Sequence, residues 1–178
     1  MKVLIVTGGI GSGKSLVSAM LAERGIPVYD SDTKAKALYD VHPHLKQMIC
    51  PDIFAKPQAL KVLEDAVYPL LMEDFRKWAE EQGRELVAME SAIILQKEFF
   101  DNFGDYVLLV EAPQELRLER AVQRGGRRDD MQRRMGLQYS QKDNPRVDFI
   151  IDNSSSVKHA EEQLDKFLKE IDYGKREN

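Results

Sequence analysis

Residues 8–15 read Gly8-Gly9-Ile10-Gly11-Ser12-Gly13-Lys14-Ser15, which satisfies the phosphate-binding pattern G-x-x-x-x-G-K-[ST], the Walker A motif. A β-branched and aliphatic run precedes this stretch at residues 2–6 and is too short for a helix. After the stretch, apolar residues recur at helical spacing from Leu16 to Leu21, until Gly25 supplies a typical helix stop. The chain therefore begins with a strand, a glycine-rich loop and a helix, which is the setting that the motif requires.

The residue types in the loop indicate a specific chemistry. Glycines let successive backbone N–H groups converge on a β-phosphate, and the positive end of the following helix adds to the attraction. In this motif Lys14 bridges the β- and γ-phosphates, and Ser15 offers its hydroxyl to Mg²⁺. We therefore assign the binding of ATP or GTP with Mg²⁺ to residues 8–15 and to Leu16, with Ser15 at the metal. The alternative is a glycine-rich structural turn whose lysine is merely solvated.

The composition is that of an ordinary globular chain. Its 178 residues, 43% of them hydrophobic, suit one domain with room for inserted subdomains. A formal net charge of −4 gives no global attraction to nucleic acid or anionic lipid. The single Cys50 cannot form an internal disulfide, and with only three histidines it makes no zinc framework. The apolar run at residues 1–6 is too short for a signal peptide, so we expect a cytoplasmic protein. The net charge leads us to expect no nucleic-acid or membrane partner. We also expect a monomer.

Further apolar strand candidates alternate with helical or loop material. They lie at residues 26–29, 86–89, 106–110 and 149–151, which together with residues 2–6 makes five. Strands that alternate with helices imply a parallel sheet covered on both faces, so we predict a three-layer α/β fold. We treat residues 1–178 as a single domain that carries a helical insertion at residues 33–82. Helices are expected there at 33–40 and 58–82, and Pro69 could interrupt the second of them.

Acidic residues follow the second expected strand. The chain has no NKxD guanine-reading motif and no long central domain of the kind that a motor carries, which favours a compact kinase. Asp30 and Asp32 lie at the edge of the sheet where ligands bind in open parallel sheets. A carboxylate there could act as a general base for an acceptor hydroxyl, or could hold Mg²⁺ through water. Either aspartate could instead cap the next helix, and that alternative stays open for both. We assign catalysis to Asp32 together with Lys14.

Four arginines follow the fourth expected strand at i, i+3 and i+4 spacing, so we expect them on one face of a helix. They are Arg117, Arg120, Arg124 and Arg128. Such a face repels itself unless an anion arrives, which predicts a lid at residues 124–137, hinged at Gly125 and Gly126, whose arginines clamp the phosphates. The alternative is a solvated helix in which the arginines pair with neighbouring acidic residues.

Two further polar positions follow strands. Glu90 comes directly after the third expected strand, where it could lie near the magnesium, accept a hydrogen bond from a substrate, or cap a helix with Ser91. Asn153 follows the last strand, where its amide could contact an adenine edge or simply form a turn. We place Asn153 among the nucleotide-binding residues.

Several segments resemble the dephospho-coenzyme A kinase family in order and spacing along most of the chain. They are LIVTGGIGSGKSLVS, GIPVYDSD, ALKVLEDAVYP, LVAMESAIIL, YVLLVEAPQELRLERAVQR and DFIIDN. The resemblance implies a fold similar to nucleoside-monophosphate kinases and a transferase of coenzyme A biosynthesis that phosphorylates the ribose 3′-hydroxyl of dephospho-CoA with ATP. It implies Asp32 as the catalytic base, Arg120 near the adenine, Arg124 near the ATP phosphates, and an acceptor-binding role for residues 33–82. We count Arg124 as catalytic.

Three stretches depart from that family's pattern. The family's His-Pro is Tyr68-Pro69 here, its Pro-Leu-Leu-Phe-Glu is Ser91-Ala-Ile-Ile-Leu95, and its later arginines are thinned out at residues 138–146. All three fall on the acceptor side of the expected site. A nucleoside or nucleotide kinase with another acceptor, and a nucleotide-binding relative with weakened catalysis, therefore stay open as alternatives.

Overall fold

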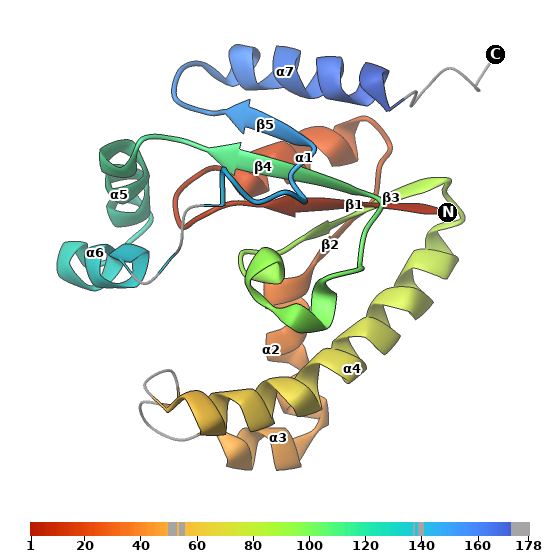
Figure 1. Cartoon of the computed structure of the whole chain (residues 1–178), viewed down its shortest axis with the longest axis vertical. Coiled ribbons are helices and arrows are strands. Elements are labelled where there is room, and N and C mark those ends of the chain that lie inside the picture. Colours follow the sequence, from red (N-terminus) through yellow and green to blue (C-terminus); the bar gives the residue numbers. More distant parts are fainter. Residues whose placement is uncertain (50–52, 54–55, 137, 139–140, 172–178) are drawn as a thin grey trace.

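The central sheet of the computed structural model has five parallel strands in the order β2-β3-β1-β4-β5 (Figure 1). The strands are β1 (Lys2–Thr7), β2 (Val28–Asp30), β3 (Leu86–Glu90), β4 (Tyr106–Glu111) and β5 (Phe149–Asp152). The structure describes residues 1–49, 53, 56–136, 138 and 141–171. The predicted five-stranded parallel sheet is confirmed, and the strand ends differ from the expected ones by at most two residues.

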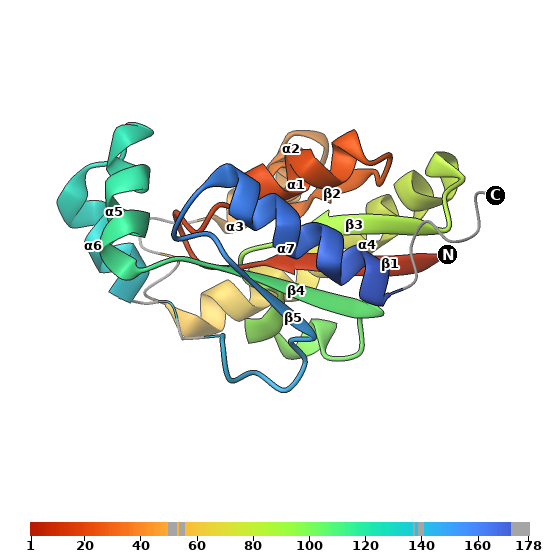
Figure 2. The same cartoon turned by 90° about the horizontal axis from the view of Figure 1, so that it is seen from above.

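Helices cover both faces of this sheet. They are α1 (Lys14–Glu23), α2 (Ser31–Val41), α3 (Pro43–Met48), α4 (Pro57–Gln82), α5 (Gln114–Gln123), α6 (Arg128–Gly136) and α7 (Val157–Glu170), with 3₁₀ turns η2 (Ile94–Gln96) and η3 (Glu98–Phe100). Alternation along β1 explains the layers, since Leu4 and Val6 join one buried cluster while Ile5 joins the other. The first cluster includes α1 and α7, which lie side by side in Figure 2, and the second includes α4. The three-layer α/β prediction is confirmed.

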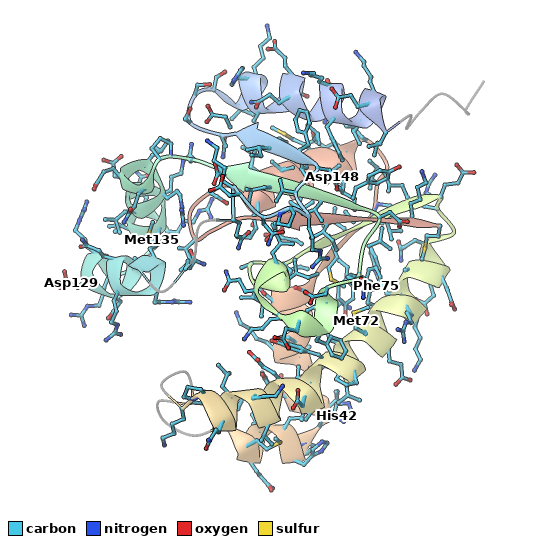
Figure 3. All side chains as sticks on the ribbon, in the orientation of Figure 1. His42, Met72, Phe75, Asp129, Met135 and Asp148 are labelled. Carbon is cyan, nitrogen blue, oxygen red and sulfur yellow. The ribbon has the colours of Figure 1, made fainter. Side chains whose placement is uncertain are left out.

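Helix α4 runs without interruption from Pro57 to Gln82, so the suggested break at Pro69 is wrong. Pro69 lies on the exposed side of the helix, where a backbone carbonyl left without its helical partner can be solvated. Buried side chains continue on both sides of it at helical spacing, and Met72 and Phe75 face the sheet in Figure 3. Burial of this apolar face outweighs the loss of one hydrogen bond.

Helix α2 begins at Ser31, two residues earlier than the expected start at residue 33. Asp30 is its N-cap, because the Asp30 Oδ1 accepts a hydrogen bond from the Thr33 N–H at 3.0 Å. The cap explains the early start, and it places Asp32 in the first turn of the helix rather than in a loop.

The basic segment after β4 forms two helices and not one. Helix α5 ends at Gln123, Arg124 follows as its C-cap, and α6 begins at Arg128. The expectation that Arg128 shares a helix face with the preceding arginines is therefore wrong. Gly125 has a φ of 94°, a conformation that glycine adopts without strain, so the backbone turns at this point. Helices α5 and α6 project beyond the carboxyl end of β4 (Figure 1).

Some expectations fall on residues outside the described ranges. These are the statements about Cys50, about residue 137 at the end of the expected lid, and about residues 139 and 140 in the stretch that departs from the family's pattern. Within the ranges that the structure describes, none of the helices is both long enough and apolar enough to cross a bilayer.

Candidate active site

The carboxyl ends of three neighbouring strands bring the predicted loop and two acidic residues together. Glu90 is the last residue of β3, and its register partners are Val6 of β1 and Asp30 of β2. The phosphate-binding loop leaves β1 directly after this pairing, and α1 begins at Lys14. Parallel register alone therefore places Glu90 between the loop and the start of α2.

The loop closes tightly against the segment that follows β5. Gly13, the residue before α1, has a φ of 104°, and a Cβ atom at this position would collide with the side-chain amide of Asn153. That amide donates a hydrogen bond to the Ser12 carbonyl oxygen at 2.8 Å. Glycine is thus required at position 13 for both its backbone conformation and its lack of a side chain.

Lys14 is half-buried at the centre of the site. Burial is the main cause that lowers the pKa of its ammonium group, and the positive charges of Arg117 and Arg124 lower the pKa further. The carboxylates of Glu90 and Asp32 oppose this shift. The ammonium group also donates to the Gly9 carbonyl oxygen at 3.4 Å. These five charged groups therefore surround the point where a phosphate would enter the loop.

Glu90 holds two hydroxyl groups of α1. Ser15 Oγ donates to Glu90 Oε1 at 3.2 Å, and Ser18 Oγ donates to Glu90 Oε2 at 2.7 Å. Glu90 caps no helix in this arrangement, which places the carboxylate beside Ser15, the residue predicted for the metal. The contact of Glu90 with a substrate stays a prediction. Ser18 was missed in the sequence, although it lies one helical turn after Ser15 and thus on the same helix face.

The two aspartates after β2 have different surroundings. Both side-chain oxygens of Asp30 bind Thr33, at 3.0 Å to its backbone nitrogen and 2.6 Å to its hydroxyl, so the cap interpretation of Asp30 is confirmed. Asp32 is open to solvent on one side, yet desolvation by the surrounding protein is the main cause that raises the pKa of its carboxyl group. The negative charges of Asp30 and Glu90 raise it further, and Lys14 opposes them.

The arginines of α5 have different partners. Arg120 Nη2 donates to the Asn153 carbonyl oxygen at 3.0 Å, and Arg117 Nε donates to the Ile10 carbonyl oxygen at 2.9 Å. Arg124 is exposed at the C-terminal end of α5, and its positive charge lies close enough to Lys14 to lower the pKa of that ammonium group. Arg120 and Arg117 thus hold the region around the loop, and Arg124 is free to meet a ligand.

Asn153 is buried and links three segments. Its backbone N–H donates to the Glu111 carbonyl oxygen at 2.8 Å, while its side chain holds Ser12 and its carbonyl accepts from Arg120. The amide nitrogen therefore already has a partner in the loop. Contact between Asn153 and an adenine stays a prediction.

On the acceptor side, Tyr68 belongs to the apolar core. Its ring packs on Phe100 at a centroid distance of 4.9 Å and on Phe99 at 5.5 Å, and the side chain is buried. The residue that replaces the family's histidine is therefore used for packing here.

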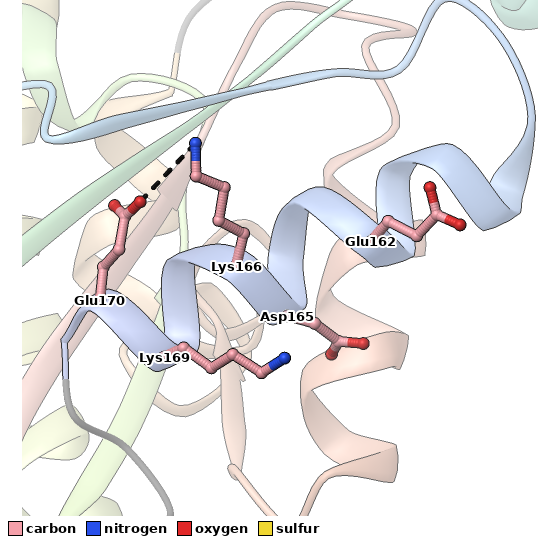
Figure 4. A pocket seen from close by; sticks show the side chains of 5 residues that line it. All are labelled: Glu162, Asp165, Lys166, Lys169 and Glu170. Carbon is pink, nitrogen blue, oxygen red and sulfur yellow. Dashed lines mark ion pairs between the residues drawn. The ribbon is translucent and has the colours of Figure 1, made fainter.

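We describe two hollows in the described part of the surface. One of about 440 Å³ lies along α7 and is lined only by charged side chains, among which Lys166 and Glu170 form an ion pair of 3.8 Å (Figure 4). These lysines and carboxylates offset one another, so we assign this hollow no chemistry. The other, of about 250 Å³, lies beside the phosphate-binding loop, between Gly9, Glu111, Arg117 and Gln138.

A Walker A loop, a lysine within it, and two carboxylates at the ends of the adjoining strands define a P-loop kinase. Comparison of the fold agrees, since the shikimate kinase from Acinetobacter baumannii matches with a TM-score of 0.61 at 20% identity, over 99% of this chain and 96% of that one. The crystal structure of TT1252 from Thermus thermophilus matches with a TM-score of 0.84 at 27% identity, over 96% of this chain and 97% of that one.

Within this class the sequence comparisons are specific. The family model described as dephospho-CoA kinase matches residues 2–51 and 45–159. A dephospho-CoA kinase from Porphyromonas gingivalis is 37% identical over 140 residues, which are 68% of this chain and 69% of the relative. The chain belongs to the dephospho-CoA kinase family, as the resemblance in the sequence predicts.

Proposed function

We propose that this chain transfers the γ-phosphoryl group of ATP to the ribose 3′-hydroxyl of dephospho-CoA, giving coenzyme A and ADP. The observation that carries the proposal is the meeting of Lys14, Asp32 and Glu90 at the phosphate-binding loop of a member of this family. One ammonium group and two carboxylates beside a phosphate cradle supply what phosphoryl transfer needs, which is charge stabilisation and a proton acceptor.

Each residue has a defined part in the proposed reaction. The acceptor oxygen attacks the γ-phosphorus, ADP leaves, and Asp32 takes the proton of the acceptor hydroxyl. Within the loop of residues 8–15, Lys14 and the amides that follow Ile10 hold the transferred charge, with Leu16 and Asn153 beside them. Arg120 supports the nucleotide side, and Arg124 neutralises charge that develops on the phosphates.

The oxygen ligands around Ser15 suit Mg²⁺. Ser15 presents an exposed hydroxyl, and Glu90 lies 3.2 Å from it with its other oxygen fixed by Ser18. Mg²⁺ prefers hard oxygen ligands and keeps several waters, so Ser15 would hold it directly and Glu90 through water. When bound, Mg²⁺ supplies positive charge to the β- and γ-phosphate oxygens.

The same proposal gives parts of the chain their roles. Residues 33–82, which include α2, α3 and α4, form the acceptor-binding subdomain, and residues 124–137, which include α6, form the lid. The turn at Gly125 supports a hinge there. We further propose a monomer that works in the cytoplasm without nucleic-acid or membrane partners, in keeping with the net charge of −4.

The experiment that tests the proposed function measures ADP formation from Mg·ATP with dephospho-CoA, with AMP, and with neither. We expect dephospho-CoA alone to stimulate ADP formation and to gain one phosphoryl group by mass. An analogue without the 3′-hydroxyl should give no stimulation. Phosphorylation of AMP in place of dephospho-CoA would instead identify a nucleotide kinase.

Replacing Glu90 with glutamine should raise the Mg²⁺ concentration needed for half-maximal turnover by roughly 10- to 100-fold, the usual effect of losing an outer ligand. The amide keeps the size of the side chain but offers a weaker partner to Ser15 and to metal-bound water. A Mg²⁺ titration at saturating ATP and dephospho-CoA measures the change. Glu85→Gln is the matched control, because Glu85 is exposed and lies directly before β3. An equal shift in both variants would refute the assignment of Glu90 to the Mg²⁺ site.

A further inference from the structure

Two side chains, one from α5 and one that follows α6, hold the two backbone polar groups of a single residue of the phosphate-binding loop. Arg117 of α5 donates from Nε to the Ile10 carbonyl oxygen at 2.9 Å. The Ile10 N–H donates to Gln138 Oε1 at 2.9 Å, and Arg117 Nη2 donates to the same oxygen at 3.1 Å. The three hydrogen bonds form a closed ring, which we call the Ile10 clamp. Both backbone groups of Ile10 are therefore occupied by side chains from outside the loop.

The glycines of the loop leave room for this clamp. A Cβ atom on Gly9 would collide with the Arg117 guanidinium and would approach Gln138 Oε1 to 2.9 Å. A Cβ atom on Gly11 would collide with the backbone of Arg117. Glycine on each side of Ile10 thus permits the close approach of α5, and it also leaves the peptide groups before and after Ile10 with little intrinsic restriction on their rotation.

The surroundings of Arg117 favour a fixed position. The side chain is half-buried, and its charge faces the carboxylate of Glu111, which opposes the effect of burial on the guanidinium pKa. The planar guanidinium uses Nε and Nη2 together, a fork that a lysine cannot reproduce. Arg117 therefore positions the loop by geometry as well as by charge.

We propose that Arg117 and Gln138 are positioning residues for the nucleotide, which fix the two peptide groups on either side of the Ile10 Cα atom so that the amides after Ile10 meet the phosphates already arranged. This inference rests on the nucleotide-binding part of the proposed function. Without the clamp, these glycine-flanked peptide groups sample other orientations, and each nucleotide that binds must order them again. Because Gln138 directly follows residues 124–137, the clamp also ties the end of the lid to the loop.

The test compares ADP affinity by calorimetry in the native chain and in Gln138→Leu, Arg117→Lys and the double variant. The cavity of about 250 Å³ beside Gln138 gives a leucine space. We expect each single change to weaken ADP binding about tenfold, the effect of one or two lost hydrogen bonds. The double variant should bind no more weakly than the worse single variant, because either change opens the same ring.

Controls separate positioning from a general structural effect. Gln123→Leu, at an exposed glutamine that ends α5 outside the lid and the clamp, should bind ADP as the native chain does. The thermal midpoint of the unliganded variants and the KM for dephospho-CoA should stay native, while the KM for ATP rises. Native ADP affinity in both single variants, or fully additive losses in the double variant, would overturn the inference.

The outcomes also distinguish the inference from the proposed function. If the native chain binds ADP and the variants bind it more weakly, the clamp stands even where dephospho-CoA is not turned over. If the native chain binds no ADP, both the nucleotide assignment and the clamp fall together.

Discussion

Asp32→Asn should lower kcat for dephospho-CoA phosphorylation by roughly 10²- to 10⁴-fold, the usual contribution of a positioned general base. The asparagine keeps the size and the place in the first turn of α2, so the helix and its Asp30 cap stay intact. What is lost is the group that takes the proton of the acceptor hydroxyl. Binding of Mg·ATP should stay within a few-fold of native, because Asp32 is not among the groups assigned to the phosphates.

The pH profile gives the same assignment a second readout. Desolvation raises the pKa of Asp32 above the ordinary aspartate value of 3.8, and Lys14 only partly opposes it. The ionised form is the base, so native kcat should be retained above the raised pKa and should fall as the pH drops through it. This acid limb should therefore lie at higher pH than an exposed aspartate would give, and it should be absent from the residual activity of Asp32→Asn.

Asp40→Asn is the matched control for this experiment. Asp40 lies on the same helix, is exposed, and forms only a surface ion pair with Lys46 at 2.9 Å. Such pairs contribute little, so turnover should be native in that variant. A native kcat in Asp32→Asn would show that the acceptor proton leaves by another route.

Sequence reasoning works best where the signal is local. The strand before the loop, the loop itself and α1 occupy residues 2–23, in which period, glycine spacing and motif all agree, and the structure has the same elements in the same places. The five strands are also found, because buried parallel strands form short apolar runs that helices separate. The family likeness extends this agreement along most of the chain.

The errors occur where an end or a break depends on a tertiary contact. Pro69 would normally end a helix, but the apolar face that α4 buries on the sheet outweighs it. Arg128 keeps the right spacing for a helix face, but the turn at Gly125 starts a new helix. In both cases the periodicity of the sequence does not show whether the helix continues or ends.

The contacts that complete the site span the whole sequence. Ser18 meets Glu90 across 72 positions, and Ile10 meets Gln138 across 128. The sequence gives neither Ser18 nor Gln138 a role of its own, so only the fold shows that they lie at the loop. The charge pattern, in contrast, correctly indicated that Arg120 and Arg124 belong to the basic segment around α5. That Arg120 contacts Asn153 and that Arg124 lies near Lys14 depends on the same long-range packing.

Lys14→Met should lower kcat by roughly 10²- to 10³-fold and should also weaken ATP binding, because it removes a positioned charge from the transferred phosphoryl group. Methionine keeps an unbranched apolar stem of similar length in the half-buried position. Turnover with saturating dephospho-CoA and calorimetric titration of ATP measure the two effects. Lys158→Met, an exposed position on α7 away from the loop, should leave both native.

The stability of the same variant separates function from folding. Since burial lowers the pKa of Lys14, the folded chain disfavours its charge relative to the unfolded chain, and the attraction of Glu90 and Asp32 does not fully compensate. At neutral pH, below both the folded and unfolded pKa values, removal of the charge should therefore not lower the thermal midpoint of the unliganded chain. The increase in midpoint that ADP produces in the native chain should disappear. A variant with both a lowered thermal midpoint and lowered activity would mean that Lys14 stabilises the fold. A variant with a native thermal midpoint that ADP no longer raises would show that the fold keeps this charge, at a cost in stability, because the nucleotide needs it.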